Sequence, residues 1–152
     1  MKHRLKNKIT STLVLFLFTF SMPGLSWAEE EKPDAPPFIE GTTKVDAERV
    51  IELVQELPDL VIIDARIAGD HLEGYIEGSI SIPDVDTNCD RLAEVIPKMD
   101  SPVLFYCNGV KCGRSVKSAK IAMSCGYHNI YWFRGGFKEW SEKGYPYITV
   151  TN

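Results

Sequence analysis

Two kinds of hydrophobic pattern alternate along this chain after residue 40. Continuous apolar runs rich in β-branched and aromatic residues predict four buried strands, at residues 60–63, 79–82, 102–106 and 129–133. Apolar residues at helical spacing predict four helices, which run from the N-cap Asp46 to Pro58 and over residues 88–96, 116–123 and 137–143. Because strands alternate with helices, we expect an α/β fold with a mostly parallel central sheet and helices on both faces.

The N-terminal part of the chain has a different composition. Residues 1–28 join a basic start, an apolar stretch at 12–20 and the small residues Ser26 and Ala28, which is typical of a secretory signal peptide. An uncleaved membrane anchor is the alternative. Acidic and proline residues at 29–37 predict a flexible linker, and residues 38–152 are predicted to form one domain. The sequence therefore indicates a protein exported to a bacterial periplasm or an equivalent space.

The charge of the exported part excludes two classes of partner. Residues 29–152 hold all 21 acidic residues and 13 of the 17 basic ones, so their net charge is −8. This segment has no basic patch typical of nucleic-acid binding and no basic amphipathic helix typical of membrane surfaces. We therefore expect no nucleic acid as a partner and no stable membrane association after signal cleavage.

The strongest chemical signal is Cys107, which directly follows the apolar run at 102–106. A glycine-bearing loop then leads to the helical pattern that begins at Val116. This order directs backbone N–H groups and a helix N-terminus toward the cysteine. The positive end of the helix, Lys111 and Arg114 favour the thiolate. Because the thiolate is the nucleophilic form, the sequence predicts an enzyme of cysteine chemistry with Cys107 as a catalytic residue.

All four cysteines lie in the exported part of the chain, and an even number in an oxidising space allows disulfides. Cys112 is five residues from Cys107, which is within disulfide reach if the loop is tight. Cys89 and Cys125 could pair, stay reduced and buried, or compete for the loop cysteines, and the sequence leaves this open. The Cys and His spacing does not suit a metal site, and we expect neither a metal nor another cofactor.

Three further segments resemble the single-domain rhodaneses, or rhodanese-like sulfurtransferases. Val61–Arg66 resembles the family's strand that ends in Asp-x-Arg, and Glu73–Pro83 resembles its Gly-His-Ile-Pro-Gly-Ala-x-x-Ile-Pro segment. Phe133–Trp140 resembles the Gly-Gly-x-x-x-Trp ending. Together with the Cys107 loop they cover nearly the whole predicted domain. The resemblance implies a rhodanese-like fold with a five-stranded, mostly parallel sheet over residues 38–152.

The same resemblance implies sulfur transfer in two steps. The Cys107 thiolate would take the sulfane sulfur of a small anionic donor such as thiosulfate or a polysulfide, and a thiol or another nucleophile, including a protein thiol, would accept it. Backbone N–H groups of the loop would hold the persulfide, with Gly109 and Gly113 at positive φ. Lys111 and Arg114 would bind the donor. The predicted substrate-binding residues are Arg66, Asn108, Gly109, Val110, Lys111, Gly113, Arg114 and Ser115, of which Ser115 would also cap the following helix.

Other residues receive structural interpretations. Asp64 and Arg66 follow a predicted strand, and an ion pair that fixes the neighbouring loop is the alternative to substrate binding by Arg66. His71 and His128 are predicted to be surface residues. The predicted core aromatics are Trp132, Phe133 and Trp140.

The chain departs from the family at two places. Tyr75 replaces the usual His, and six residues separate Cys107 from Arg114, which makes the active loop longer. Our hypothesis is that Cys112, the second catalytic residue, attacks the Cys107 persulfide, releases sulfide and leaves a Cys107–Cys112 disulfide. The alternative is that Cys112 only fills space in the loop.

Three other functions are alternatives to sulfur transfer. One is a thiol–disulfide redox protein in which the two loop cysteines cycle, and another is a module that carries sulfur to a partner protein. An oxyanion-reducing or phosphatase-like enzyme is disfavoured because the loop lacks the Cys-x5-Arg spacing of phosphate-binding loops.

Overall fold

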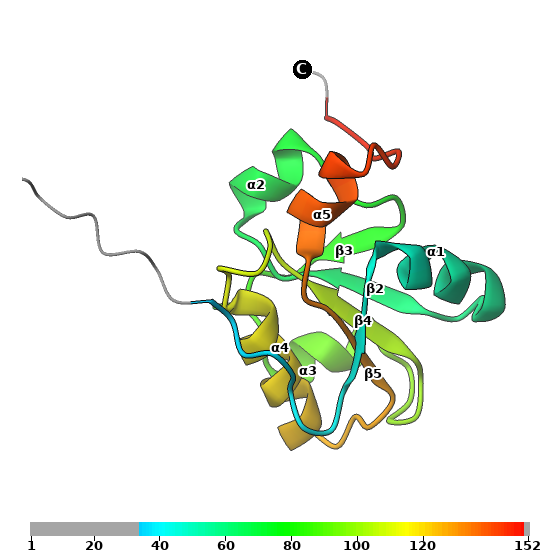
Figure 1. The fold of residues 1–152 in the computed structure, drawn as a ribbon. Coiled ribbons are helices and arrows are strands. Elements are labelled where there is room, and N and C mark those ends of the chain that lie inside the picture. The colour runs from blue at the N-terminus through cyan, green and yellow to red at the C-terminus, as the bar shows by residue number, and fades with distance from the viewer. Residues whose placement is uncertain (1–33, 151–152) are drawn as a thin grey trace, which may run out of the picture. The chain divides into compact units, whose positions relative to one another are not determined.

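A computed structural model of the chain describes residues 34–150. The predicted signal peptide at 1–28, the first part of the predicted linker and the last two residues lie outside this range. The described part forms an α/β domain around one five-stranded, all-parallel sheet in the order β1-β5-β4-β2-β3 (Figure 1). The strands are β1 (Thr43–Val45), β2 (Val61–Asp64), β3 (Ser79–Ser81), β4 (Val103–Tyr106) and β5 (Ile130–Phe133).

This sheet confirms the fold class predicted from the sequence. The four apolar runs became β2 to β5, whereas β1 carried too weak a pattern for prediction. It contains one buried residue, Val45, after the exposed Thr43 and Lys44, and it pairs at the sheet edge with β5 alone.

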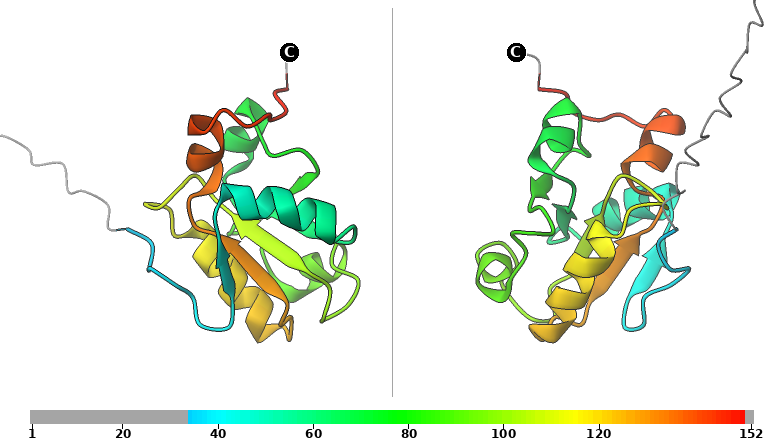
Figure 2. Two further views of the ribbon diagram at one scale, coloured as in Figure 1. Left: turned by 45° about the vertical axis from the view of Figure 1, so that its right-hand side comes forward. Right: turned by 90° about the vertical axis from the view of Figure 1, so that its left-hand side faces the viewer.

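Helices cover both faces of the sheet (Figure 2). They are α1 (Ala47–Glu56), α2 (Ala68–Glu73), α3 (Cys89–Ala93), α4 (Arg114–Ser124) and α5 (Gly136–Glu142). Helices α1 and α5 pack against one face, and α3 and α4 pack against the other. The alternation of side chains along each strand explains this, since Ile62, Leu104 and Phe133 face the first pair while Ile63, Phe105 and Trp132 face the second.

The helix boundaries agree with the sequence in part. Asp46 caps α1 by accepting a hydrogen bond from the Arg49 N–H at 2.9 Å, as predicted. Helix α3 ends at Ala93 rather than Ile96, because the residue before Pro97 is disfavoured in helical conformation. The segment predicted to be a loop between β2 and β3 contains the six-residue helix α2. Trp132, Phe133 and Trp140 are buried, which confirms the predicted core aromatics.

A disulfide between Cys89 and Cys125 joins the start of α3 to the end of α4. The two Cα atoms lie 5.5 Å apart, and the cysteines are 36 residues apart in the chain. Pairing is thus the outcome among the alternatives that the sequence left open for these two residues.

The end of the predicted linker is held against the domain. Ala35 is buried, its N–H donates to the Val110 carbonyl at 2.6 Å, and its carbonyl accepts from Arg134 Nη2 at 2.8 Å. Arg134 Nε also donates to the Pro36 carbonyl at 2.9 Å. Arg134 and the active loop thus hold the backbone of Ala35 and Pro36, at the end of the predicted linker, whereas the flexibility of residues 29–37 stays a prediction.

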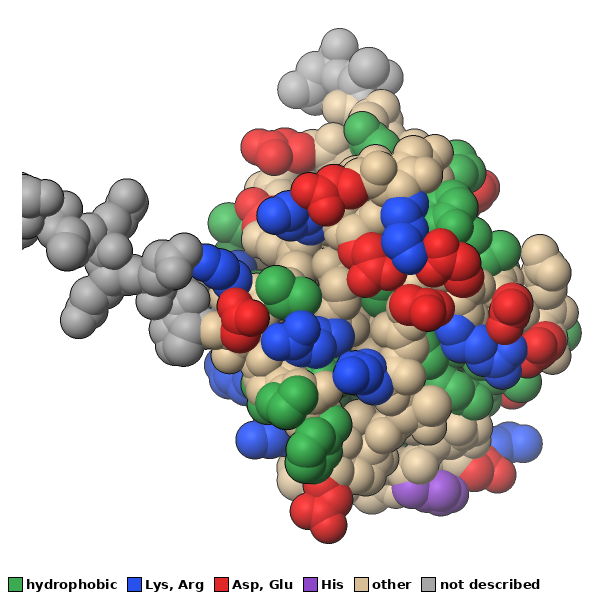
Figure 3. Space-filling view, in the orientation of Figure 1, with side chains coloured by type: hydrophobic (Ala, Val, Ile, Leu, Met, Phe, Trp, Pro, Cys, Tyr) green, Lys and Arg blue, Asp and Glu red, His purple; other side chains and the backbone are tan. Residues whose placement is uncertain are grey.

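Charges of both signs are interspersed on the face that carries α1 and α5 (Figure 3). Arg49 pairs with Glu52 and Glu56 along α1, and Lys143 at the end of α5 pairs with Glu48. Within residues 34–150, no helix has the length and apolar character needed to cross a membrane.

Candidate active site

The carboxyl edge of the sheet brings together the two segments singled out by the sequence. Cys107 directly follows β4, Asp64 is the last residue of the neighbouring strand β2, and Asp64 lies in register with Tyr106. In parallel α/β sheets this edge is where ligands bind. The predicted meeting of the Cys107 loop and the Asp64–Arg66 segment is confirmed.

The first residues of α5 fix the backbone of the Cys107 loop. Phe137 N–H donates to the Cys107 carbonyl at 2.8 Å, and Lys138 N–H donates to the Asn108 carbonyl at 2.9 Å. Gly136 has φ +60°, and an added Cβ would lie 2.2 Å from the Cys107 carbonyl oxygen. Only glycine permits this approach. The glycine pair Gly135-Gly136 of the Gly-Gly-x-x-x-Trp segment is therefore part of the scaffold of the site.

Cys107 and Cys112 form a disulfide, with Cα atoms 6.3 Å apart. This confirms that Cys112 lies within disulfide reach of Cys107. Both residues are largely buried, at 2 % exposure for Cys107 and 6 % for Cys112. The structure thus represents the oxidised loop, in which neither sulfur is a nucleophile until the bond is reduced.

A pocket of about 270 Å³ opens beside this disulfide. Three cationic side chains and one of the two cysteines contribute to its wall, which consists of Asn108, Gly109, Val110, Lys111, Cys112, Arg114 and Lys138. Five of the eight predicted substrate-binding residues are therefore brought together at one pocket. Lys138, on α5, was missed by sequence reasoning because nothing in the chain order places it against the loop.

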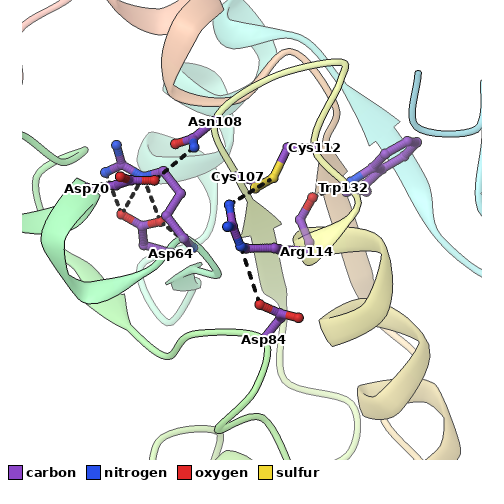
Figure 4. The surroundings of a disulfide bond; sticks show 10 residues. Asp64, Asp70, Asp84, Cys107, Asn108, Cys112, Arg114 and Trp132 are labelled. Atoms are coloured by element: carbon purple, nitrogen blue, oxygen red, sulfur yellow. Dashed lines mark hydrogen bonds and ion pairs between the residues drawn. A yellow bond between two sulfur atoms is a disulfide. The ribbon is translucent and has the colours of Figure 1, made fainter. Parts of the chain in front are cut away.

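Arg114 is directed at the disulfide (Figure 4). Its Nη1 atom lies 3.8 Å from Cys112 Sγ, and its Nε atom lies 3.6 Å from Asp84 Oδ1. Asp84 also pairs with Lys117 Nζ at 3.1 Å. The guanidinium therefore stands between a carboxylate and the second loop cysteine.

Two predicted backbone and capping roles are wrong. Ser115 lies inside α4, where its buried hydroxyl accepts from Trp132 Nε1 at 3.0 Å, and the N-cap is Gly113, without a side-chain cap. Gly113 has φ −85°, and Gly109 is also outside the positive-φ glycines of residues 34–150. Gly109 instead packs closely against α5, since an added Cβ would come 3.3 Å from Lys138 Cβ and the Lys138 side chain would have to shift slightly.

Arg66 belongs to a buried network around Asp64. Its Nη2 atom lies 2.6 Å from Asp64 Oδ2 and also donates to the Gly74 carbonyl at 2.6 Å. Tyr106 OH donates to the same Asp64 oxygen at 2.8 Å, and His71 Nδ1 lies 2.8 Å from it. Arg66 thus forms the ion pair that was the alternative to substrate binding. Arg66 also lines a second pocket, which shares the lining residues Asn108 and Lys138 with the first pocket.

The electrostatics of this network keep Asp64 ionised. Burial by itself raises the pKa of Asp64, but the hydrogen bonds and charge of Arg66, with a hydrogen bond from His71, hold the pKa below its usual value. Burial, together with the Asp64 carboxylate, raises the pKa of Tyr106 above its usual range. The network therefore works as a fixed, charged anchor next to the Cys107 loop.

Helix α2 supplies two residues that the sequence did not assign to the site. His71 was predicted to be a surface residue, but it contacts Asp64 and stacks on Tyr75 with ring centroids 4.1 Å apart. Asp70 Oδ2 accepts from Asn108 Nδ2 at 2.8 Å and so ties the loop to α2. Both were missed because α2 itself was not predicted. His128 is exposed, as expected. Within residues 34–150, no three His, Cys, Asp or Glu side chains form a metal site.

Fold and site together define a parallel α/β domain with a cysteine-bearing loop at the carboxyl end of its central strand. Residues 46–143 match the family model described as the Rhodanese-like domain. The chain belongs to this family, as its sequence motifs indicated.

Similar proteins agree with this assignment. Rhodanese domain-containing protein CG4456 of Drosophila melanogaster is 32 % identical over an alignment of 97 residues, and the match covers 57 % of this chain and 86 % of that protein. Thiosulfate sulfurtransferase of Pseudomonas aeruginosa superposes with a TM-score of 0.61 at 25 % identity, over 73 % of this chain and 21 % of that one. The polysulfide-sulfur transferase homodimer of Wolinella succinogenes superposes with a TM-score of 0.58 at 23 % identity, over 72 % of this chain and 80 % of that one.

Proposed function

We propose that this protein is a sulfurtransferase that moves a sulfane sulfur from a small anionic donor to a thiol or another nucleophile through a Cys107 persulfide. The observation that carries the proposal is the place of Cys107, which follows the central strand of a rhodanese-like domain beside a pocket with three cationic side chains. The fold shared with a thiosulfate sulfurtransferase and a polysulfide-sulfur transferase supports the same reaction class.

The first step of the proposed reaction takes place on the reduced loop. The Cys107 thiolate attacks the outer sulfur of thiosulfate or a polysulfide, a new S–S bond forms, and the rest of the donor leaves with the electron pair of the broken bond. Sulfite is the leaving group when thiosulfate is the donor. Lys111, Arg114 and Lys138 line the pocket through which the anion arrives, and their charge lowers the cost of bringing it next to a thiolate.

The second step transfers the sulfur onward by one of two routes. An external thiolate or cyanide can attack the outer sulfur and release the Cys107 thiolate. Alternatively, Cys112 attacks Cys107 Sγ, the outer sulfur leaves as HS⁻ and the Cys107–Cys112 disulfide forms. The 6.3 Å separation of the Cα atoms supports the second route, which needs an external thiol to reduce the disulfide before another cycle.

The test is thiocyanate formation from thiosulfate and cyanide by the prereduced protein and by Cys107→Ser and Cys112→Ser variants. The proposal predicts turnover by the unmodified protein and by Cys112→Ser, and none by Cys107→Ser. Absence of both thiocyanate and a Cys107 persulfide, with thiosulfate and with polysulfide, would overturn it. A persulfide without turnover would instead indicate the sulfur-carrier module.

A second candidate function is thiol–disulfide exchange, and the Cys107–Cys112 disulfide is the observation that favours it. In that case the Cys107–Cys112 disulfide would be reduced as it oxidises a substrate dithiol, and an external disulfide would reoxidise the loop before another cycle. Activity would require both loop cysteines without any sulfane donor. Oxidation of a reduced model dithiol at equal rates with and without polysulfide, and loss of it in Cys112→Ser, would favour this function over sulfur transfer.

We propose a periplasmic location for the protein. The composition of residues 1–28 and the two disulfides of the domain support export to an oxidising space. In fractionated bacterial cells, the proposal predicts a periplasmic protein whose N-terminus is Glu29. Recovery of the full-length chain in the membrane fraction would indicate the uncleaved anchor instead.

A further inference from the structure

The longer active loop places a guanidinium against its second cysteine and holds it there with a carboxylate from another part of the fold. Asp84 lies three residues after the end of β3 and directly after Pro83, far from the loop in sequence. Its Oδ1 atom lies 3.6 Å from Arg114 Nε, while Arg114 Nη1 lies 3.8 Å from Cys112 Sγ. Figure 4 shows the three side chains in this order.

We propose that Asp84 is a positioning residue that holds the Arg114 guanidinium at Cys112, so that Cys112 is ionised when it releases sulfide from the Cys107 persulfide. This inference rests on the proposed sulfur transfer and adds to it the residue that prepares the resolving thiol. Neither Asp84 nor its role follows from the sequence motifs.

Burial and charge support the arrangement. The Asp84 side chain is 15 % exposed and that of Arg114 is 33 % exposed, so their attraction is screened less than that of a surface pair. Arg114 begins α4, and Asp84 is the carboxylate with which its guanidinium pairs, so Asp84 can fix the direction of this long side chain. A cation near a cysteine favours the thiolate, and the effect falls as the distance grows.

The step balances in atoms and electrons. The Cys107 persulfide and Cys112 share one proton. The Cys112 sulfur bonds to Cys107 Sγ, the S–S bond of the persulfide breaks with its electron pair on the outer sulfur, and this sulfur leaves with the proton as HS⁻. The Cys112 sulfur is oxidised and the sulfane sulfur is reduced. An external thiol, oxidised in turn, regenerates the two cysteines.

Other charged groups also face Cys112, and the test has to separate them from Asp84. Lys111 lies on the same loop, and Lys138 reaches the pocket from α5. Lys117 lies on the far side of Asp84. The negative charge of Asp84 by itself disfavours a nearby thiolate. Removing this charge therefore moves the pH at which Cys112 ionises in opposite directions, depending on whether Asp84 acts through its own charge or by positioning Arg114. A simple charge effect of Asp84→Asn would make Cys112 ionise at lower pH, whereas loss of Arg114 positioning would make it ionise at higher pH.

The experiment measures the pH dependence of Cys112 alkylation by iodoacetamide in the reduced Cys107→Ser background, with and without Asp84→Asn. We expect the midpoint to move to higher pH and the alkylation rate at neutral pH to fall by about threefold to tenfold, since one pH unit is tenfold in thiolate. Asp84→Glu should restore the profile. Asp86→Asn, on an exposed residue of the same loop, is the matched charge control and should leave it unchanged or move it to lower pH.

A second readout follows sulfide release from the preformed Cys107 persulfide. Asp84→Asn should slow HS⁻ release at neutral pH by a similar factor, and the two rates should converge at alkaline pH, where Cys112 is ionised in both proteins. An Asp84→Asn profile that is unchanged or moves to lower pH, in a protein with native thermal unfolding, would overturn the proposal. If no persulfide forms at all, the sulfur-transfer proposal fails, and the alkylation profile still decides the role of Asp84.

Discussion

The two disulfides of this domain differ in the length of chain that they close and in what surrounds them. Cys89–Cys125 links α3 to the end of α4 and closes 36 residues, whereas Cys107–Cys112 closes five residues within one loop. Helix α4 separates them. It starts beside Cys112 and runs about 16 Å, at 1.5 Å per residue, before it reaches Cys125.

The two disulfides are expected to contribute differently to the free energy of unfolding, because they restrict the unfolded chain to different extents. Closing 36 residues restricts the unfolded chain by about 4 kcal/mol, and closing five restricts it by about 2 kcal/mol. The Cys107 loop also has supports that do not depend on its sulfur atoms, because the Phe137 and Lys138 N–H groups hold the Cys107 and Asn108 carbonyls. The loop bond can therefore open and close while the fold persists, and the helix bond can serve stability alone.

The largest expected difference between the two pairs is in activity. Cys107→Ser should lower thiocyanate formation by about a thousandfold or more, because the nucleophile is lost. The Cys89→Ser/Cys125→Ser double variant should keep its rate within about twofold when folded, since these cysteines lie at the other end of α4. Steady-state assays with thiosulfate and cyanide measure both. A helix-pair variant that is inactive although folded would break the comparison.

The second expected difference is in stability. Under oxidising conditions, Cys89→Ser/Cys125→Ser should lower the free energy of unfolding by about 4 kcal/mol, and Cys107→Ser/Cys112→Ser by about 2 kcal/mol. Guanidinium unfolding followed by tryptophan fluorescence gives both values. An equal or larger loss for the loop pair would show that its disulfide is structural.

The sequence predicted most of the fold and only part of the candidate site. Long apolar runs predicted β2 to β5, and the Cys107 loop predicted the site, because local composition carries both signals. His71 and Asp84 reach the site only through tertiary packing, and no local pattern marks them. A capping role is predicted for Ser115 since serine is common at helix starts, but α4 begins at Arg114, two residues before the predicted start at Val116, and buries that hydroxyl against Trp132.

The third prediction concerns the separate roles of Cys107, which carries the persulfide, and Cys112, which resolves it. Cys112→Ser should lengthen the lifetime of the Cys107 persulfide about tenfold or more, because an intramolecular nucleophile at a high effective concentration has been removed. Mass spectrometry at timed intervals after donor treatment measures the lifetime, with Cys125→Ser as the control. An unchanged lifetime would leave Cys112 with a space-filling role.

The smallest expected effect concerns donor binding. Lys138→Gln should raise the KM for thiosulfate about twofold to threefold, because exposed cations attract an anion weakly across solvent. Lys120→Gln, on the exposed side of α4 away from the loop pocket, is the matched control and should leave the KM unchanged. Equal effects of the two substitutions on the KM would indicate that the positive charges attract thiosulfate from any part of the surface, and not that thiosulfate binds at the loop pocket.

The most direct test of the account is the intact mass of the reduced protein after one equivalent of polysulfide, combined with measurement of free sulfide. The account predicts that Cys112→Ser gains one sulfur atom on Cys107, whereas the unmodified loop releases sulfide and ends as the Cys107–Cys112 disulfide. A protein that stays fully reduced, with no sulfur added at Cys107 in either form, would contradict it.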